Sequence, residues 1–238
     1  MEGVGMKDSV ILQSFTSAQS LRESMLKKTK NIILEAVQKR GRASLALSGG
    51  NTPKPFFEAL STLELPWDKI DITLVDERWV DTSNSDSNEY LVRHFLMQNQ
   101  AAQANFIGLK NEAISAQEGV KACQERLDCF KDDFDLVILG MGEDGHTASF
   151  FPKARTLDKA LKTGETCVAI TPPEAKYERM TLSLSRLLRT KKLFLHIEGE
   201  AKFKTLSKAA QVGDIQAMPI RAFLLKESKP YLEVFYAQ

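Results

Sequence analysis

The sequence predicts an α/β fold with three layers, helix on sheet on helix, around a mostly parallel, Rossmann-like sheet. Short and nearly continuous apolar runs alternate with longer segments in which apolar residues recur at helical spacing. A half-exposed antiparallel sheet would show polar and apolar residues in alternation, so these runs indicate parallel strands covered on both faces. No repeat, linker or charge block divides the 238 residues, and we expect one domain over 1–238.

The N-terminal part of the chain follows the order strand, helix, strand, helix. Ser9–Phe15 has the length and the β-favouring residues of a strand, and Ser17 is placed to cap the long helix that follows. Gly41 ends that helix, Ala43–Leu47 is the next strand, and helical spacing resumes at Phe56.

The remaining elements repeat this order. Further strands are expected at Ile70–Val75, Phe134–Leu139, Cys167–Ile170, Met180–Leu184, Leu193–Ile197 and Tyr231–Phe235. Further helices are expected at Glu89–Met97, at Ala113–Cys129 and from Glu200 onwards. Three unusual loops, 48–53, 76–79 and 140–146, each follow a strand. Ligands of open parallel sheets bind beyond the carboxyl ends of the strands, so we expect these loops to share a site.

The first loop, Ser48-Gly49-Gly50-Asn51-Thr52-Pro53, has the composition of a phosphate cradle. Its glycines permit positive φ and close approach of a ligand, Thr52 can cap a helix, and Pro53 suits a first helical turn, whose free N–H groups favour an anion. No P-loop or GxGxxG pattern is present, so nucleotide binding is not implied. A plain strand-to-helix turn is the alternative interpretation.

The second loop, Asp76-Glu77-Arg78-Trp79, places two carboxylates and a guanidinium at one strand end. Arg78 could hold an anionic oxygen, and the carboxylates could orient it or bind sugar hydroxyls. A surface charge cluster above Trp79 is the alternative.

The third loop, which runs from Gly140 to Pro152, follows the most apolar strand and joins main-chain amides, a carboxylate and an imidazole. His146 can act as a base because the unperturbed pKa of histidine lies near neutral pH. His94 and His196 fall within a predicted helix and an apolar strand and are interpreted as structural. Arg179 and Lys202 each offer a cation near a turn or a helix start.

Composition excludes several classes of partner. The formal net charge is 32 − 31 = +1, which gives no electrostatic reason to expect binding to nucleic acid or to an anionic membrane. Cys123, Cys129 and Cys167 show no metal-site or disulfide spacing, and we expect reduced thiols and no metal. No signal peptide or membrane span is apparent, so a cytoplasmic protein is predicted.

Six motifs occur in one order along the chain: Ser-Gly-Gly-Asn-Thr-Pro at 48–53, Asp-Glu-Arg-Trp-Val at 76–80, Ser-Asp-Ser-Asn-Glu at 85–89, Gly-Met-Gly-Glu-Asp-Gly-His-Thr-Ala-Ser at 140–149, Arg-Met-Thr at 179–181 and Gly-Glu-Ala-Lys at 199–202. By these motifs the chain resembles the glucosamine-6-phosphate isomerase/6-phosphogluconolactonase family, in the superfamily that also contains ribose-5-phosphate isomerase. The resemblance covers essentially the whole chain.

The resemblance implies hydrolysis of 6-phospho-D-glucono-1,5-lactone to 6-phospho-D-gluconate in the pentose phosphate pathway, without a metal or an organic cofactor. His146 would be the general base for attack of water on the lactone carbonyl, and Asp144 would orient His146 or the water. Arg78 or loop amides near Gly142 would stabilise the oxyanion.

Substrate binding is implied for the remaining motif residues. The phosphate would contact the amides of Gly49 and Gly50 with Arg179 and Lys202, and the division of the cations between phosphate and carbonyl stays open. Asp76 and Asn51 would contact ring hydroxyls. The remaining members of the expected binding set are Ser48 and Thr52.

Two other functions compete with the hydrolase. An amino-sugar phosphate deaminase of the same superfamily carries a glutamate immediately before the proline of the histidine loop, whereas Phe151 precedes Pro152 in this chain. A phenyl ring cannot transfer protons, so the hydrolase is favoured. A non-catalytic sugar-phosphate sensor would usually carry a DNA-binding module, for which the strand beginning near Ser9 leaves no room. We expect a monomer or a weak homo-oligomer.

Overall fold

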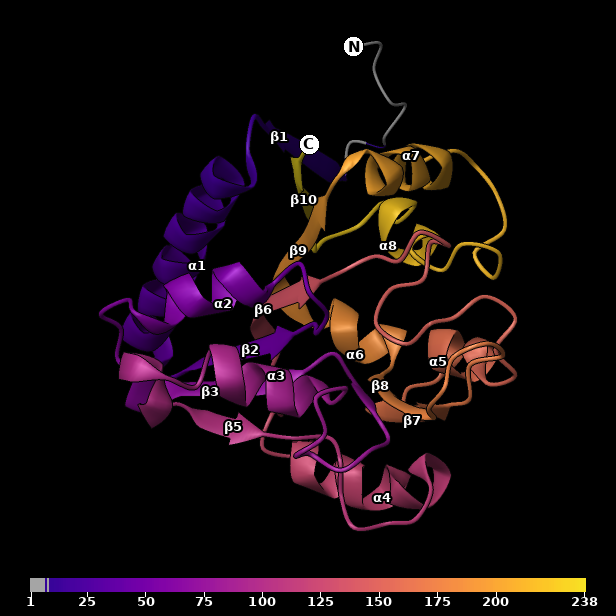
Figure 1. Ribbon diagram of the computed structural model, residues 1–238, viewed down its shortest axis with the longest axis horizontal. Helices are drawn as coiled ribbons and strands as arrows, with labels where there is room; N and C mark the ends of the chain where they lie inside the picture. The colour runs from indigo at the N-terminus through magenta and orange to yellow at the C-terminus, as the bar shows by residue number, and fades with distance from the viewer. Residues whose placement is uncertain (1–6, 8) are drawn as a thin grey trace.

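The larger of two sheets forms the centre of the molecule (Figure 1). The structure is a computed structural model and describes residue 7 and residues 9–238; the expectations for residues 1–6 and 8 lie outside the described residues. The strands of the larger sheet are Val10–Phe15 (β1), Ala43–Leu47 (β2), Ile70–Leu74 (β3), Asn105–Ile107 (β5), Phe134–Leu139 (β6), Thr190–Glu198 (β9) and Leu232–Ala237 (β10). Their order is β1-β10-β9-β6-β2-β3-β5, and every neighbouring pair runs parallel.

Helices cover this sheet on both sides, which confirms the predicted three-layer α/β architecture. The helices are Ala18–Arg40 (α1), Lys54–Ser61 (α2), Asn88–Phe95 (α3), Ala116–Leu127 (α4), Leu157–Lys162 (α5), Leu184–Leu188 (α6), Glu200–Ala209 (α7) and Arg221–Leu224 (α8), with 3-10 turns at Trp67–Lys69 and Asn99–Gln103. In Figure 1, α1 lies on the left of the sheet, and α5 to α8 lie on its right.

A second, antiparallel sheet corrects one expectation. It consists of Asp76–Arg78 (β4), Arg179–Leu182 (β8) and Cys167–Ile170 (β7) in that spatial order. The sequence predicted strands near β7 and β8 without separating them from the main sheet, and it assigned 76–79 to a loop. The chain leaves the main sheet at Val75, whose carbonyl accepts a hydrogen bond from the Leu182 N–H (2.9 Å), and β4 then pairs with β8.

Local signals at helix ends are partly confirmed. Ser17 caps α1 by accepting a hydrogen bond from the Ser20 N–H (3.1 Å), and Gly41 ends α1 with its N–H donating to the Val37 carbonyl (2.8 Å). Thr52 does not cap α2, because Pro53 occupies the position before that helix and no side chain caps it. The short elements β5, α5, α6 and α8 were not predicted, since runs of three to six residues show no periodicity.

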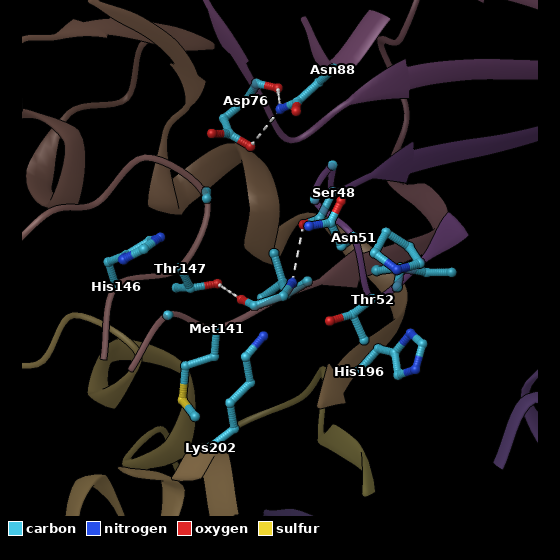
Figure 2. Close-up of a pocket in the computed structure, with 18 of the residues that line it drawn as sticks. Ser48, Asn51, Thr52, Asp76, Asn88, Met141, His146, Thr147, His196 and Lys202 are labelled. Carbon is cyan, nitrogen blue, oxygen red and sulfur yellow. Dashed lines mark hydrogen bonds between the residues drawn. The ribbon is translucent and has the colours of Figure 1, made fainter. Parts of the chain in front are cut away.

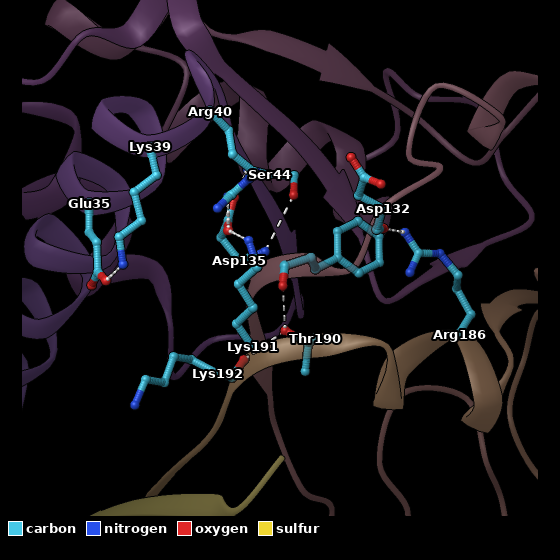
Figure 3. A network of polar contacts seen from close by, with 11 residues as sticks. Glu35, Lys39, Arg40, Ser44, Asp132, Asp135, Arg186, Thr190, Lys191 and Lys192 are labelled. Atoms are coloured by element: carbon cyan, nitrogen blue, oxygen red, sulfur yellow. Dashed lines mark hydrogen bonds and ion pairs between the residues drawn. The ribbon is translucent and has the colours of Figure 1, made fainter. Parts of the chain in front are cut away.

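Buried polar contacts fix the amino ends of the central strands (Figure 3). Asp135 at the start of β6 is 3% exposed. Its carboxylate accepts hydrogen bonds from Arg40 at the end of α1, from Lys191 in β9 (2.9 Å) and from the Ser44 N–H in β2 (3.0 Å). These contacts join α1, β2, β6 and β9 at the edge of the sheet opposite the carboxyl ends of the strands.

The core follows the predicted apolar runs. All six residues of β6 are buried, as expected for the most apolar strand. Cys123 and Cys167 are buried, Cys129 is exposed, and all three thiols are free. Within the part of the chain that the structure describes, none of the helices has the length and apolar character to cross a membrane.

Candidate active site

A cavity of about 260 Å³ lies beyond the carboxyl ends of β2, β6 and β9 (Figure 2). The three loops predicted to share a site all contribute to its lining. The expected site residues that line it are Ser48, Gly49, Gly50, Asn51, Thr52, Asp76, Arg78, Gly142, His146 and Lys202. Asp144 and Arg179, also expected in the site, are outside this lining.

The loop between β2 and α2 presents free main-chain donors to the cavity. Gly50 adopts φ +99°, a conformation that favours glycine. Within residues 7 and 9–238, the N–H groups of Gly49, Gly50, Asn51 and Thr52 donate no hydrogen bond to another protein atom. Successive free N–H groups before a helix form a concave site with positive potential, which suits a phosphate group.

Asn88 connects this loop to Asp76. A Cβ atom on Gly49 would lie 1.9 Å from the Asn88 Oδ1 atom, so the Asn88 side chain fits only against a glycine. The Asn88 Nδ2 group donates to the Asp76 carbonyl (2.9 Å), and the Ser149 hydroxyl donates to the Asp76 Oδ2 atom (2.5 Å). Asn88 lines the cavity, and its only sequence signal was its place in the motif at 85–89.

Glu77 does not line the cavity and holds β4 against the start of α3. Its carboxylate has no exposed surface and accepts hydrogen bonds from the N–H groups of Arg78, Asn88 and Glu89 (2.7 Å each) and from the Ser87 hydroxyl (3.0 Å). Burial raises the pKa of Glu77 to about 7, although each of these hydrogen bonds acts to lower it. The structure therefore gives Glu77 a supporting position, and Asp76 is the carboxylate that reaches the cavity.

His146 and Asp144 form a hydrogen-bonded pair. The Asp144 Oδ1 atom lies 2.6 Å from the His146 Nδ1 atom and also accepts the His146 N–H (3.0 Å). Burial acts to raise the pKa of Asp144, but the hydrogen bonds from His146 outweigh it and lower the pKa below its ordinary value. A carboxylate at Nδ1 places the proton on that nitrogen and leaves Nε2 as the basic atom.

Gly142 supports the same pair from the main chain. A Cβ atom at this position would lie 2.2 Å from Cε1 and 2.3 Å from Nδ1 of the His146 ring, so a side chain would displace the imidazole. The Gly142 N–H donates to the His146 carbonyl (2.9 Å). That amide is therefore committed to the turn, which makes it a poor donor for an oxyanion.

The three expected cations occupy different positions. Arg78 lines the cavity and donates from Nη1 to the Asp86 carbonyl (2.5 Å). Lys202 is in the first turn of α7, and Figure 2 shows its amino group directed into the cavity. Arg179 is Arg78's partner in the register of β4 and β8 and donates to the Tyr177 carbonyl (2.9 Å).

His196 is placed differently from its interpretation as a structural residue. It is 3% exposed and lines the cavity, with Nε2 2.9 Å from the Glu198 carboxylate. Its Nδ1 atom has no hydrogen-bond partner among the described residues. The hydrogen bond from His196 is the main reason why the pKa of Glu198 is lowered. His94 stacks on Tyr90 on α3 with ring centroids 5.6 Å apart, consistent with a structural role.

We searched the described part of the chain for clusters of side chains that could bind a metal ion. Among residues 7 and 9–238, no group of three or more His, Cys, Asp or Glu side chains is placed to hold a metal ion.

Comparisons with known proteins identify the family of the chain. The model of the family described as glucosamine-6-phosphate isomerases/6-phosphogluconolactonase matches residues 16–232. A 6-phosphogluconolactonase from Rhizobium meliloti is 39% identical over 231 residues, covering 96% of this chain and 99% of the relative. The corresponding protein from Pseudomonas aeruginosa is 39% identical over 215 residues, covering 90% of each chain.

Solved structures extend the similarity to the fold. The crystal structure of a 6-phosphogluconolactonase from Shewanella baltica superposes with a TM-score of 0.95 at 42% identity, covering 98% of this chain and 100% of that one. A monomeric glucosamine-6-phosphate deaminase, at 16% identity and a TM-score of 0.79, shares the fold. The chain thus belongs to the glucosamine-6-phosphate isomerase/6-phosphogluconolactonase family.

Proposed function

We propose that this chain hydrolyses 6-phospho-D-glucono-1,5-lactone to 6-phospho-D-gluconate. The observation that supports this most is that one cavity is lined both by His146, whose ring is hydrogen-bonded to Asp144 behind it, and by a loop whose four successive N–H groups donate to no other atom of the described residues. Lactone hydrolysis needs a base for water, and a phosphorylated substrate needs an anion site. The relatives named 6-phosphogluconolactonase give the specific substrate.

In the proposed mechanism His146 activates water. Asp144 accepts a hydrogen bond from the Nδ1–H group, which keeps its proton. Nε2 takes a proton from the water as the water oxygen attacks the lactone carbonyl carbon. The carbonyl oxygen becomes an oxyanion, which we assign to Arg78 because the Gly142 amide is committed to the His146 carbonyl. Collapse of the tetrahedral intermediate breaks the bond from this carbon to the ring oxygen, and the proton held by His146 passes to that oxygen.

We assign the phosphate group to the part of the cavity formed by the loop after β2, away from His146. The free N–H groups of Gly49 to Thr52 and the Lys202 amino group would hold it, and the Ser48 side chain supports the loop by accepting the Gly140 N–H (3.1 Å). Asn51 and Asp76 would bind ring hydroxyls. Arg179 does not line the cavity. It would therefore act on the phosphate only at a distance, by adding positive potential from its place beside Arg78.

The wider setting is part of the same proposal. We assign residues 1–238 to one catalytic domain, acting in the cytoplasm on a small sugar-phosphate lactone, without nucleic acid or membrane partners and as a monomer or weak homo-oligomer.

Acid release from freshly prepared 6-phosphogluconolactone, corrected for spontaneous hydrolysis, tests the function. We expect the rate to rise in proportion to enzyme and to fall by at least about a hundredfold in His146→Ala, since general base catalysis commonly contributes about 10²–10⁴. Equal rates with and without enzyme would refute the lactonase. Ammonia release from glucosamine 6-phosphate would identify a deaminase instead.

A further inference from the structure

Phe151 lies against the proposed base. The rings of His146 and Phe151 are stacked, with centroids 4.4 Å apart and an interplanar angle of 28°. The proposed mechanism uses only the nitrogen atoms of the imidazole, so it does not explain this contact.

The loop is folded in a way that brings Phe151 back to His146. Ala148 between them has φ +48°, a left-handed conformation that is uncommon for a residue with a side chain. The Phe150 N–H donates to the Thr147 carbonyl and the Phe151 N–H to the Ser149 carbonyl (3.0 Å each). The tight reversal returns the chain over the imidazole, and strain held at such a place is typical of functional loops.

The hydrogen bond from Asp144 does not by itself fix the orientation of the His146 ring, so the contact with Phe151 has a task. The His146 side chain is 31% exposed and the Asp144 side chain 51% exposed, so water competes for their hydrogen bond. Rotation about the bond from Cβ to the ring is soft for histidine, and one hydrogen bond at Nδ1 does not fix the plane of the ring. Gly142 adjoins only the edge formed by Nδ1 and Cε1.

Phe151 also lines a second hollow, to which His146 does not contribute. That hollow, of about 340 Å³, is lined by Asp144 and Phe151 together with segments 152–153 and 173–175, whereas His146 lines the catalytic cavity. The Arg179 guanidinium lies 5.8 Å from the centre of the Phe151 ring, within the range of a cation–π contact. Phe151 is thus supported from β8 as it contacts the imidazole.

We propose that Phe151 is a positioning residue, which fixes the plane of the His146 imidazole so that Nε2 points at the attacking water. This proposal rests on the proposed function, because it assigns a task to the base of that reaction. Three contacts then define the ring: Asp144 at Nδ1, Gly142 at the adjoining edge and Phe151 on one face.

Phe151→Leu and Phe151→Tyr test the proposal. Leucine keeps an apolar side chain but removes the aromatic face, and we expect kcat to fall about ten- to a hundredfold, because small misplacements of a catalytic group have such effects. KM should change by less than about twofold, because the stack does not involve the phosphate cradle. Tyrosine keeps the stack and should restore kcat to within about threefold of the wild type.

A second readout does not depend on activity. Ring ¹⁵N chemical shifts of neutral His146 in the wild type should show a protonated Nδ1 and a bare Nε2, and in Phe151→Leu a mixture of the two tautomers. Phe150→Leu is the matched control, since the Phe150 ring stacks on Phe223; it should lower thermal stability but leave kcat and the His146 shifts unchanged.

The outcomes separate the two proposals. Wild-type kcat and a single tautomer in Phe151→Leu would overturn the role of Phe151, as would an equal loss of kcat in Phe150→Leu. A wild-type protein without lactonase activity would instead refute the proposed function, and the ¹⁵N shifts would still report whether Phe151 holds the ring.

Discussion

Arg78 and Arg179 lie opposite each other as paired residues of β4 and β8. Burial is the main cause that lowers the pKa of Arg179, and the positive charge of Arg78 is the next. Asp76, Glu77 and Asp86 act in the other direction. Two neighbouring guanidinium groups repel each other. An anion bound at this edge of the cavity would be attracted by both and would reduce their repulsion.

Arg78→Met should mainly lower kcat. If Arg78 stabilises the oxyanion, the variant loses an interaction that exists only in the transition state, and the loss of one such donor costs about 10²–10³ in kcat. KM should change little. The matched variant Arg179→Met should lose less activity, because Arg179 does not line the cavity. A rise in KM at unchanged kcat in Arg78→Met would instead place Arg78 on the phosphate.

Lys202→Met should weaken recognition of the phosphate. A hydrogen bond to a charged group contributes about 1.5–3 kcal/mol, so the preference of kcat/KM for phosphorylated over unphosphorylated gluconolactone should fall about ten- to a hundredfold. Lys204→Met is the control, because Lys204 is on the same helix but is 73% exposed and paired with Glu200. An unchanged preference in Lys202→Met would remove Lys202 from the phosphate site.

The parallel sheet could be predicted because its strands carry their own signal. Residues 43–47, 70–75 and 134–139 are mostly apolar runs bounded by turn residues, because most side chains on both faces of those strands are buried. β4 has no such signal. Its three residues are charged, and what makes it a strand is pairing with β8, which is distant in sequence. Non-local pairing of this kind leaves no local periodicity.

The site could be predicted as far as topology determines it. Ser48 to Thr52 and His146 follow parallel strands, whose carboxyl ends share one edge of the sheet. The contact between Asp144 and His146 depends on the conformation of one turn, and spacing alone does not give that conformation. Asn88 and His196 are brought to the cavity by α3 and β9, and no pattern in these two segments indicates which of their side chains face the cavity.

Asp135→Ala should reduce stability without reducing activity. The variant leaves the Ser44 N–H in β2 and the cations Arg40 and Lys191 without their buried partner, and we expect a loss of about 1–3 kcal/mol in the free energy of unfolding. Kinetic constants should be retained, since Asp135 is at the opposite edge of the sheet from the cavity.

The matched control for Asp135 is a surface ion pair on α1, the helix that carries Arg40. Glu35→Ala removes the partner of Lys39, both side chains being 64% exposed, and should change the free energy of unfolding by less than about 0.5 kcal/mol. Urea denaturation monitored by tryptophan fluorescence gives both values. Equal effects of the two substitutions would show that burial at Asp135 contributes nothing.

Glu77 should make the stability of the protein depend on pH near neutrality. Burial raises the pKa of this carboxyl from 4.5 to about 7, so between these values the folded chain holds a proton that the unfolded chain has released. Linkage then requires the free energy of unfolding to fall as pH rises through this window, by up to about 3 kcal/mol. Glu77→Gln cannot titrate, and the difference between wild type and variant, measured by urea denaturation at pH 5 and pH 8, isolates this group. A difference independent of pH would mean that the four hydrogen bonds keep the carboxylate ionised throughout.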